Sequence, residues 1–390
     1  MIPRLKPALG ISEFIAAMRL PGKNDLEEFE RYFALSMDQK HAVAFPYGRT
    51  GLIFLLEALG LRDKEIICPA YTCVVVPHAT VYSGNKPVFI DCGKDDFNMD
   101  LAMAEEAITE KTGAIIATSL FGYPVDLDRL DRIKKAHPDI RVIQDCAHSF
   151  AAEWKNRPVQ KAGDAALFGL NISKMITSIF GGIVTTDDGD LAARIALLRR
   201  QKLKKASFAK SAKRFLYLIA IYAAFSESTY RFVNYLERSE FLDPYVQYFD
   251  ERRIDMPDDY LESLCSVEAR VGIVNLLRYN NLIARRRAAA EYYFNHLKNT
   301  DEFKLPPEHP GATYSHFVVQ VSDRKKWLEK GLESGIQLGQ LIEYSIPEMS
   351  AYGLHSLDEF PMAGRFSRHT INLPVWGGAE LAERIIKRLM

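Results

Sequence analysis

The first half of the chain alternates short apolar runs with segments of helical length. The runs carry apolar or β-branched residues on both faces, as buried parallel strands do. They are Ala42–Ala44, Glu65–Cys68, Pro87–Ile90, Ala114–Ala117, Val142–Gln144, Ala165–Leu170 and Gly182–Thr185. Helix-length segments such as Leu52–Leu59 and Leu127–Ala136 lie between them. This alternation predicts an α/β fold of three layers, with a mostly parallel sheet covered by helices on both faces.

The second half of the chain has a different pattern, with long helical periods from about Leu191 onward. Val267–Leu297 is predicted to form one long helix, and Tyr314–Val321 a strand. Arg324–Glu333 and Glu380–Met390 have the pattern of two further helices. We therefore expect a smaller C-terminal domain of α+β type.

These patterns predict two domains. The large α/β domain is expected over residues 1–250, with a helical insertion near 203–250. The linking helix and the small domain are expected over residues 251–390.

One segment combines basic and apolar residues. Lys202–Arg214 is rich in lysine and is followed by the apolar run Phe215–Phe225. Eleven helical residues extend only about 16 Å, too short for a hydrocarbon core of roughly 30 Å. Two interpretations stay open: a helix buried against the body or a second subunit, and a peripheral contact of residues 202–225 with an anionic membrane surface.

Charge and cysteine content narrow the class of protein. The 390 residues include 50 Lys and Arg against 50 Asp and Glu, so no global field favours nucleic acid, and no nucleic-acid partner is expected. Five irregularly spaced cysteines without a C-x-x-C pair predict neither a disulfide framework nor a metal site. A reducing compartment and an N-terminus without an apolar signal region favour the cytoplasm.

Lys174 is the first candidate for chemistry. It follows the apolar run that ends near Leu170, and Asn171 and Ser173 share its short polar loop. A lysine among small and apolar neighbours after a buried strand is placed where desolvation lowers its pKa, and the neutral amine can then form a Schiff base. A solvated loop lysine is the simpler alternative.

Asp145 and His148 form the second candidate group. Asp145 closes the apolar run Val142–Gln144, and the carboxyl end of a strand in an α/β sheet faces the crevice where ligands bind. A carboxylate there can keep the pyridine nitrogen of pyridoxal phosphate (PLP) protonated. Asp145 could instead cap a helix, and His148 could be a core histidine.

The third candidate is a turn that opens a helix. Gly48, Arg49 and Thr50 precede the segment that continues to Leu59. The free N–H groups and the positive dipole end of such a helix suit a phosphate, to which Arg49 and Thr50 could add side-chain donors.

The order of these three groups is that of fold-type-I PLP enzymes, and the surrounding motifs resemble the DegT/StrS family of PLP-dependent sugar aminotransferases. Each block of that family has a counterpart here, in the same order. The blocks are YGRTGL (Tyr47–Leu52), SLFGYPVDLD (Ser119–Asp128), VIQDCAHSFAA (Val142–Ala152), FGLNISKMITSIFGG (Phe168–Gly182) and FPMAGRFSRHTINLPVW (Phe360–Trp376).

The resemblance implies a role for each candidate. Lys174 would carry PLP as a Schiff base and move the proton, Asp145 would pair with the pyridinium nitrogen, and His148 would lie beside the ring. Gly48–Thr50 would hold the phosphate. The family also commonly builds its sites at a homodimer interface.

Several positions depart from the family pattern. Gly169 replaces a serine that usually binds the phosphate, and Asn171 or Arg49 could compensate. Cys73 replaces the aromatic residue that usually stacks on the ring, so Cys73 or Tyr71 must cover that face. Tyr260–Ser263 fits the family's N-x-R segment poorly. The cofactor chemistry is therefore expected to be intact and the substrate pocket to be divergent.

The activity that the resemblance implies is amination of a keto sugar attached to a nucleotide, with glutamate as donor. The first alternative is a PLP-dependent deoxysugar dehydratase, although dehydrating relatives tend to have histidine in place of the lysine. The second is a non-catalytic regulatory protein on the same fold.

Overall fold

The computed structural model describes all of the chain except residues 95, 240–249, 354 and 357. The strands are β1 (His41–Phe45), β2 (Glu65–Pro69), β3 (Lys86–Ile90), β4 (Thr112–Thr118), β5 (Arg141–Asp145), β6 (Glu153–Trp154), β7 (Arg157–Pro158), β8 (Ala165–Gly169), β9 (Gly182–Thr186), β10 (Phe303–Lys304), β11 (Phe317–Val321) and β12 (Thr370–Leu373). The helices are α1 (Ile11–Met18), α2 (Asp25–Ser36), α3 (Gly48–Ala58), α4 (Val75–Tyr82), α5 (Leu101–Glu106), α6 (Leu127–Ala136), α7 (Gly189–Lys202), α8 (Phe208–Ala224), α9 (Tyr230–Arg238), α11 (Ser266–Leu277), α12 (Tyr279–His296), α13 (Arg324–Glu333), α14 (Pro361–His369) and α15 (Gly378–Leu389).

Seven strands form the large sheet, in the order β1-β9-β8-β5-β4-β2-β3. All seven apolar runs singled out in the sequence are strands of this sheet. Only β9 runs antiparallel to its neighbours β1 and β8, and the remaining pairings are parallel. The predicted mostly parallel α/β sheet is confirmed.

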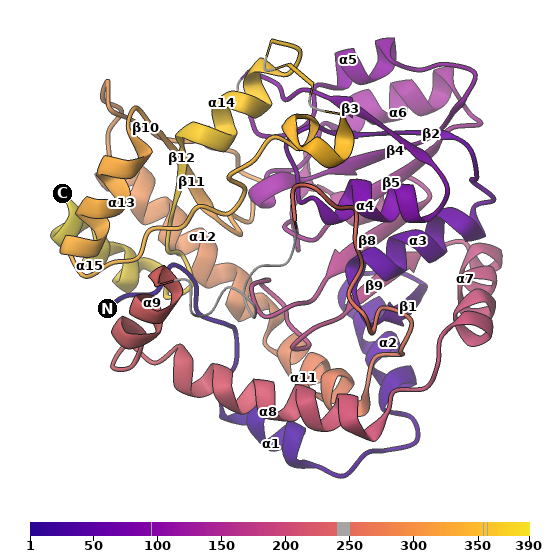
Figure 1. The fold of residues 1–390 in the computed structure, drawn as a ribbon, viewed down its shortest axis with the longest axis horizontal. Coiled ribbons are helices and arrows are strands. Elements are labelled where there is room, and N and C mark those ends of the chain that lie inside the picture. The colour runs from indigo at the N-terminus through magenta and orange to yellow at the C-terminus, as the bar shows by residue number, and fades with distance from the viewer. Residues whose placement is uncertain (95, 240–249, 354, 357) are drawn as a thin grey trace.

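Helices cover both faces of this sheet (Figure 1). Successive strand residues point to opposite faces, so neighbours in one strand belong to different cores. Ile66 lies in a core with residues of α3, α4 and α7, whereas Ile67 lies in a core with residues of α2, α5, α6 and α11. The apolar character of the runs on both faces follows from this three-layer arrangement.

A second, antiparallel sheet has the order β10-β11-β12 and packs with α12, α13 and α15. The start of the chain also lies here. Ile2 is fully buried in this core, and its N–H donates to Gly335 O at 2.9 Å. Figure 1 shows both chain ends beside α9 and α15. Residues of the first and last segments therefore share one core.

The long helix expected over Val267–Leu297 is two helices, α11 and α12. The helix breaks at Arg278, where φ is −100° and ψ is 3°. The Arg278 guanidinium binds the fully buried carboxylate of Glu13 in α1, at 2.7 Å. The residue at the break thus pairs with a helix far away in the sequence, and the helical repeat over Val267–Leu297 does not reveal such a contact.

Helices α8 and α9 lie in the region expected as a helical insertion, of which residues 240–249 lie outside the described part. One side of α8 is buried: Leu218 packs with Val267 and Val271 of α11. Lys210 and Arg214, which the sequence placed in a basic surface, are 6% and 5% exposed. Across the described residues, no helix is both long and apolar enough to span a membrane.

Candidate active site

Lys174 lies in the loop that joins β8 to β9. Leu170 N donates to Gly181 O at 2.9 Å, which brings the two ends of the loop together beside Gly169 and Gly182. Lys174 N donates to Asn171 O at 3.0 Å and closes a turn within the loop. The loop is therefore a defined turn that holds the lysine at the carboxyl end of β8.

The Lys174 side chain is half-buried, and its amine has no hydrogen-bond or ion-pair partner among the described residues. Desolvation lowers the pKa of Lys174, while negative charge on Cys73 and on Asp145 would raise it. Desolvation disfavours the charged ammonium. The site thus favours a neutral amine that is free to react.

Asp145 ends β5 next to Thr118 of β4, its partner in the parallel register. Asp145 Oδ1 accepts from Ala147 N at 3.1 Å and Oδ2 accepts from Thr118 Oγ1 at 3.3 Å. Desolvation raises the pKa of Asp145, opposed by the bond from Ala147 and the charge of Lys174. The two hydrogen bonds orient the carboxylate. A cation placed against it would stabilise its charged form.

His148 lies buried next to Phe121 and Lys174. Its Nδ1 accepts from Phe121 N at 3.4 Å, so the neutral ring carries its proton on Nε2. The His148 and Phe121 rings stack with centroids 5.9 Å apart. Desolvation, with the charges of Lys174 and His316, holds the pKa of His148 well below its usual range. The imidazole is thus kept neutral beside the lysine.

His316 also borders this site, although no sequence motif singles it out. Its ring lies 5.2 Å from that of His148, and desolvation and the charge of Arg286 lower its pKa. Phe121, which contacts both histidines, has φ of 54°. A bulky residue in the left-handed region costs of order 1–3 kcal/mol, and such strain gathers at functional sites. The two histidine rings meet only because the start of β11 packs against the loop that contains Phe121.

The first turn of α3 approaches the lysine loop closely because glycines line the contact. A Cβ on Gly182 would lie 2.3 Å from Gly48 Cα, and a Cβ on Gly48 would lie 3.5 Å from Gly169 Cα. The first N–H groups of an α-helix have no acceptor within the helix. The close approach thus brings these donors and the helix dipole to the end of the sheet that carries Lys174.

The side chains of Arg49 and Thr50 contact the segment that precedes α11. Thr50 is fully buried, and its Oγ1 donates to Tyr260 O at 3.1 Å. An Arg49 guanidinium nitrogen donates to Asp255 O at 3.5 Å. In this structure the Thr50 hydroxyl is therefore directed at a backbone carbonyl, which leaves the first N–H groups of the helix as the donors expected for a phosphate.

Cys73 and Tyr71 were alternatives for the face of the ring. Tyr71 is fully buried in the core, and its hydroxyl donates to Ile342 O at 3.2 Å. Cys73 is half-buried at the start of α4, close enough to Lys174 for its charge to act on the lysine. Of the two, only Cys73 borders the site.

Asn171 shapes the lysine loop. Its side-chain oxygen accepts from Ser173 N at 3.1 Å and from Ser173 Oγ at 2.6 Å. Asn171 is solvent-exposed. Its carbonyl is thus used within the turn, and a contact of Asn171 with a phosphate stays a prediction.

Comparison with known proteins identifies the family to which this chain belongs. A sequence profile of the DegT/DnrJ/EryC1/StrS aminotransferase family matches residues 16–221 and 261–390, and leaves out 222–260, which include α9. The chain is 27% identical over 358 residues to the dTDP-3-amino-3,6-dideoxy-alpha-D-galactopyranose transaminase of Aneurinibacillus thermoaerophilus, covering 90% of this chain and 85% of that one.

Two further proteins are similar. The GDP-perosamine synthase of Caulobacter vibrioides is 37% identical over 175 residues, 45% of this chain and 47% of that protein, so the match spans about half the length of this relative. The structure of DesV of S. venezuelae in complex with a ketimine intermediate has a TM-score of 0.77 at 23% identity and covers 99% of this chain and 97% of that one, which shows a shared fold. The extent of the profile match establishes that the chain belongs to the DegT/DnrJ/EryC1/StrS aminotransferase family.

Proposed function

We propose that this protein is a PLP-dependent aminotransferase that aminates a keto sugar carried by a nucleotide. The observation that carries the proposal is the unpartnered, desolvated amine of Lys174, which lies near the Asp145 carboxylate and the N-terminal turn of α3. A reactive amine, a carboxylate that has no cationic partner in bonding contact within the described part of the chain, and the N–H donors of a helix start form the donor set that PLP requires.

Each group has a defined task in this proposal. Bound PLP supplies the electron sink for the reaction. The Lys174 amine would hold the cofactor and, when released from it, move a proton as base and acid. The Asp145 carboxylate would hold a proton at the ring nitrogen, and neutral His148 would lie beside the ring. The first-turn N–H groups of Gly48, Arg49 and Thr50 would bind the phosphate.

The nucleotide-linked sugar and the glutamate donor are inferred from the relatives. The two named curated relatives are a GDP-perosamine synthase and a dTDP-linked amino sugar transaminase. Lys174 favours transamination over dehydration, since dehydrating relatives tend to have histidine there. A purely regulatory role would need neither Lys174 nor Asp145. Production of a keto-deoxysugar without incorporated amino nitrogen would favour the dehydratase.

The proposal is tested by Lys174→Ala. We expect the wild-type protein to show the absorption band of lysine-bound PLP and to lose it when glutamate is added. The variant lacks the amine that forms the Schiff base, so the band should be absent and turnover should fall by at least about 10³-fold, a loss expected when a catalytic group is removed.

Lys205→Ala is the matched control, because this lysine is exposed. It should keep both the band and the turnover. A band that persists unchanged in Lys174→Ala would contradict the assignment. Screening keto nucleotide sugars against the amino form of the cofactor, by recovery of the PLP band, identifies the acceptor.

We also propose that the protein works as a homodimer in the cytoplasm. The cytoplasmic location rests on the irregular spacing of the five cysteines, which favours a reducing compartment, and the dimer rests on the family. Light scattering on the eluted protein measures its mass directly, and a mass near 44 kDa, that of one chain, would contradict the dimer.

A further inference from the structure

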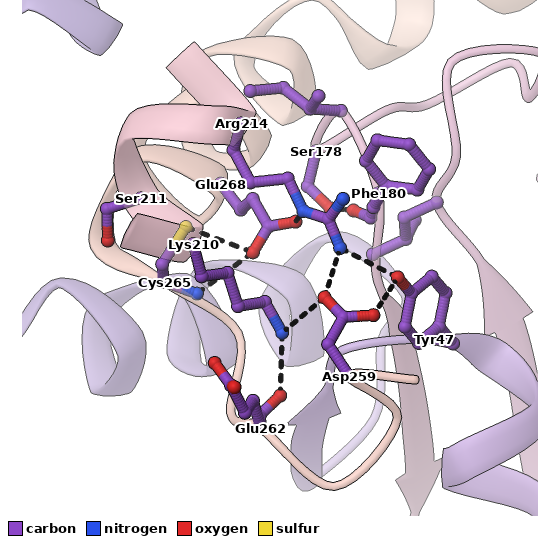
Figure 2. A network of polar contacts seen from close by, with 12 residues as sticks. Tyr47, Ser178, Phe180, Lys210, Ser211, Arg214, Asp259, Glu262, Cys265 and Glu268 are labelled. Carbon is purple, nitrogen blue, oxygen red and sulfur yellow. Dashed lines mark hydrogen bonds and ion pairs between the residues drawn. The ribbon is translucent and has the colours of Figure 1, made fainter. Parts of the chain in front are cut away.

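A buried network of charges lies behind the turn that opens α3. Figure 2 shows Arg214 of α8 at its centre. Arg214 is 5% exposed, and its guanidinium contacts Glu268 Oε1 at 3.0 Å and Asp259 Oδ2 at 2.8 Å. Lys210 Nζ lies 3.3 Å from Asp259 Oδ2 and donates to Glu262 O at 2.8 Å. Two cations thus meet two carboxylates, and only the Asp259 side chain of the four is partly exposed.

The same guanidinium reaches the residue that precedes α3. Arg214 Nη2 donates to Tyr47 Oη at 2.7 Å, and Tyr47 Oη donates to Asp259 Oδ1 at 2.5 Å. Tyr47 is the N-cap residue of α3, so its position sets that of the first-turn N–H groups. The hydroxyl is therefore held from two sides, by a cation and by a carboxylate.

Arg214 also contacts the lysine loop. Its guanidinium lies over the Phe180 ring, 4.0 Å from the centroid, and the Tyr47 and Phe180 rings meet edge to face at 6.1 Å. Phe180 belongs to the loop between β8 and β9 that carries Lys174. One side chain thus touches the helix turn and the lysine loop together, although it comes from a separate helix.

We propose that Arg214 is a positioning residue that holds the phosphate-binding turn of α3 in register with the Lys174 loop. The inference rests on the proposed function and adds a residue that does not itself touch the cofactor. Arg214 acts on the turn through Tyr47. Loss of the Arg214 side chain should therefore weaken binding of the phosphate group more than binding of the pyridine ring.

The test compares PLP with pyridoxal, which lacks the phosphate. The dissociation constant of each is measured from the absorption of the lysine-bound form. The ratio of the dissociation constant of pyridoxal to that of PLP reports the phosphate contribution. In Arg214→Gln, PLP binding should weaken at least about tenfold, the range for losing a hydrogen bond to a charged group. Pyridoxal binding should change little, so the ratio falls. Arg214→Lys keeps the charge and should recover part of the lost PLP affinity.

Arg270→Gln is the matched control. Arg270 is also a buried arginine of this region, 8% exposed, and it donates to Asp25 Oδ2 at 2.7 Å and to Ala16 O at 2.9 Å, in α2 and α1. This variant should lower the melting temperature and leave the ratio unchanged. If Arg214→Gln does not fold, Tyr47→Phe serves instead. It removes only the hydroxyl that Arg214 and Asp259 hold, and it should also lower the ratio.

The outcomes separate the two proposals. A wild-type protein that binds PLP, with the same ratio in the Arg214 and Tyr47 variants, would overturn the positioning role alone. A wild-type protein that binds neither compound would overturn the proposed function, and the positioning role with it. An equal fall of the ratio in Arg270→Gln would show a general loss of stability and would also overturn the role of Arg214.

Discussion

Glycine occupies the position five residues before Lys174, where the family has a serine. A Cβ added to Gly169 would lie 3.4 Å from Lys174 Cε and 3.5 Å from Ala147 Cβ, which is close to ordinary van der Waals contact. The backbone therefore has room for a serine there, and the proposed phosphate site lacks the side-chain donor that the family pattern would place at this position. At Gly182, by contrast, a Cβ would lie 2.3 Å from the backbone of Gly48.

Gly169→Ser should tighten PLP binding by about threefold to tenfold, because the new hydroxyl supplies one hydrogen bond worth about 1 kcal/mol to the phosphate. Titration of the apoprotein with PLP measures the change. Gly182→Ala is the opposite case, since the methyl group must displace the first turn of α3. It should cost about 1–3 kcal/mol of stability and weaken PLP binding. Weaker binding in Gly169→Ser would show that the hydroxyl does not reach the phosphate.

At the scale of the element, α8 has two unlike sides. Its inner side carries Lys210 and Arg214, which pair with carboxylates of the body. Its outer side exposes large apolar residues: Phe208, Leu216 and Ile219 are 89%, 65% and 41% exposed. Two basic residues of the segment, Lys210 and Arg214, therefore pair inside the protein, and the prediction of a membrane contact depends on the remaining lysines.

The outer side predicts weak binding to anionic vesicles. Lys204, Lys205 and Lys213 are exposed beside the apolar residues of α8. Each basic residue near an anionic surface contributes about 1 kcal/mol, so replacing all three by glutamate should lower vesicle binding at least tenfold. Co-sedimentation with anionic and with neutral vesicles measures it, and binding should weaken at high salt.

A matched variant carries the same charge reversal elsewhere. Lys298, Lys304 and Lys325 are exposed lysines near the second sheet, and their replacement by glutamate should leave vesicle binding unchanged. Equal partitioning of the wild-type protein and the Lys204, Lys205 and Lys213 variant would remove the membrane contact from consideration and favour an interface between subunits.

At the scale of the whole molecule, buried histidines make stability depend on pH. His78, His148 and His316 all have lowered pKa values because burial desolvates them. For His78 desolvation and the charge of Arg49 bring the pKa to about 4, against the opposing charge of Asp255. The unfolded chain binds a proton near pH 6.5. The folded protein therefore loses stability as the pH falls below about 6.5, down to the folded pKa.

His78→Phe should remove this penalty. Among the described residues neither ring nitrogen of His78 has a hydrogen-bond partner, and Asp255 Oδ1 lies 3.9 Å from Nδ1. The ring stacks on Tyr352 with centroids 5.9 Å apart. Phenylalanine keeps the stack and cannot be protonated. Relative to wild type, the variant should gain about 2 kcal/mol of stability between pH 7 and pH 5. Urea unfolding at the two values measures the gain, and an equal difference at both would contradict the burial of a neutral His78.

The sequence by itself determined the strands of the large sheet and the order in which the turn, Asp145 and Lys174 follow one another. Strand patterns are local, because a buried strand must be apolar on both faces wherever it lies in the chain. The sequence also shows the chemical types of Lys174 and Asp145 and the glycines that let α3 approach, since each is a property of a short segment.

Only the tertiary structure decided the rest. His316 lies against His148 although 168 positions separate them in the chain, and Arg214 of α8 holds Tyr47. At the break between α11 and α12, Arg278 pairs with Glu13 of α1. These features arise from contacts between segments far apart in sequence, where burial and charge balance depend on which surfaces meet. A lysine-rich run has the same sequence pattern whether its charges face water or, as at Lys210 and Arg214, the inside of the protein.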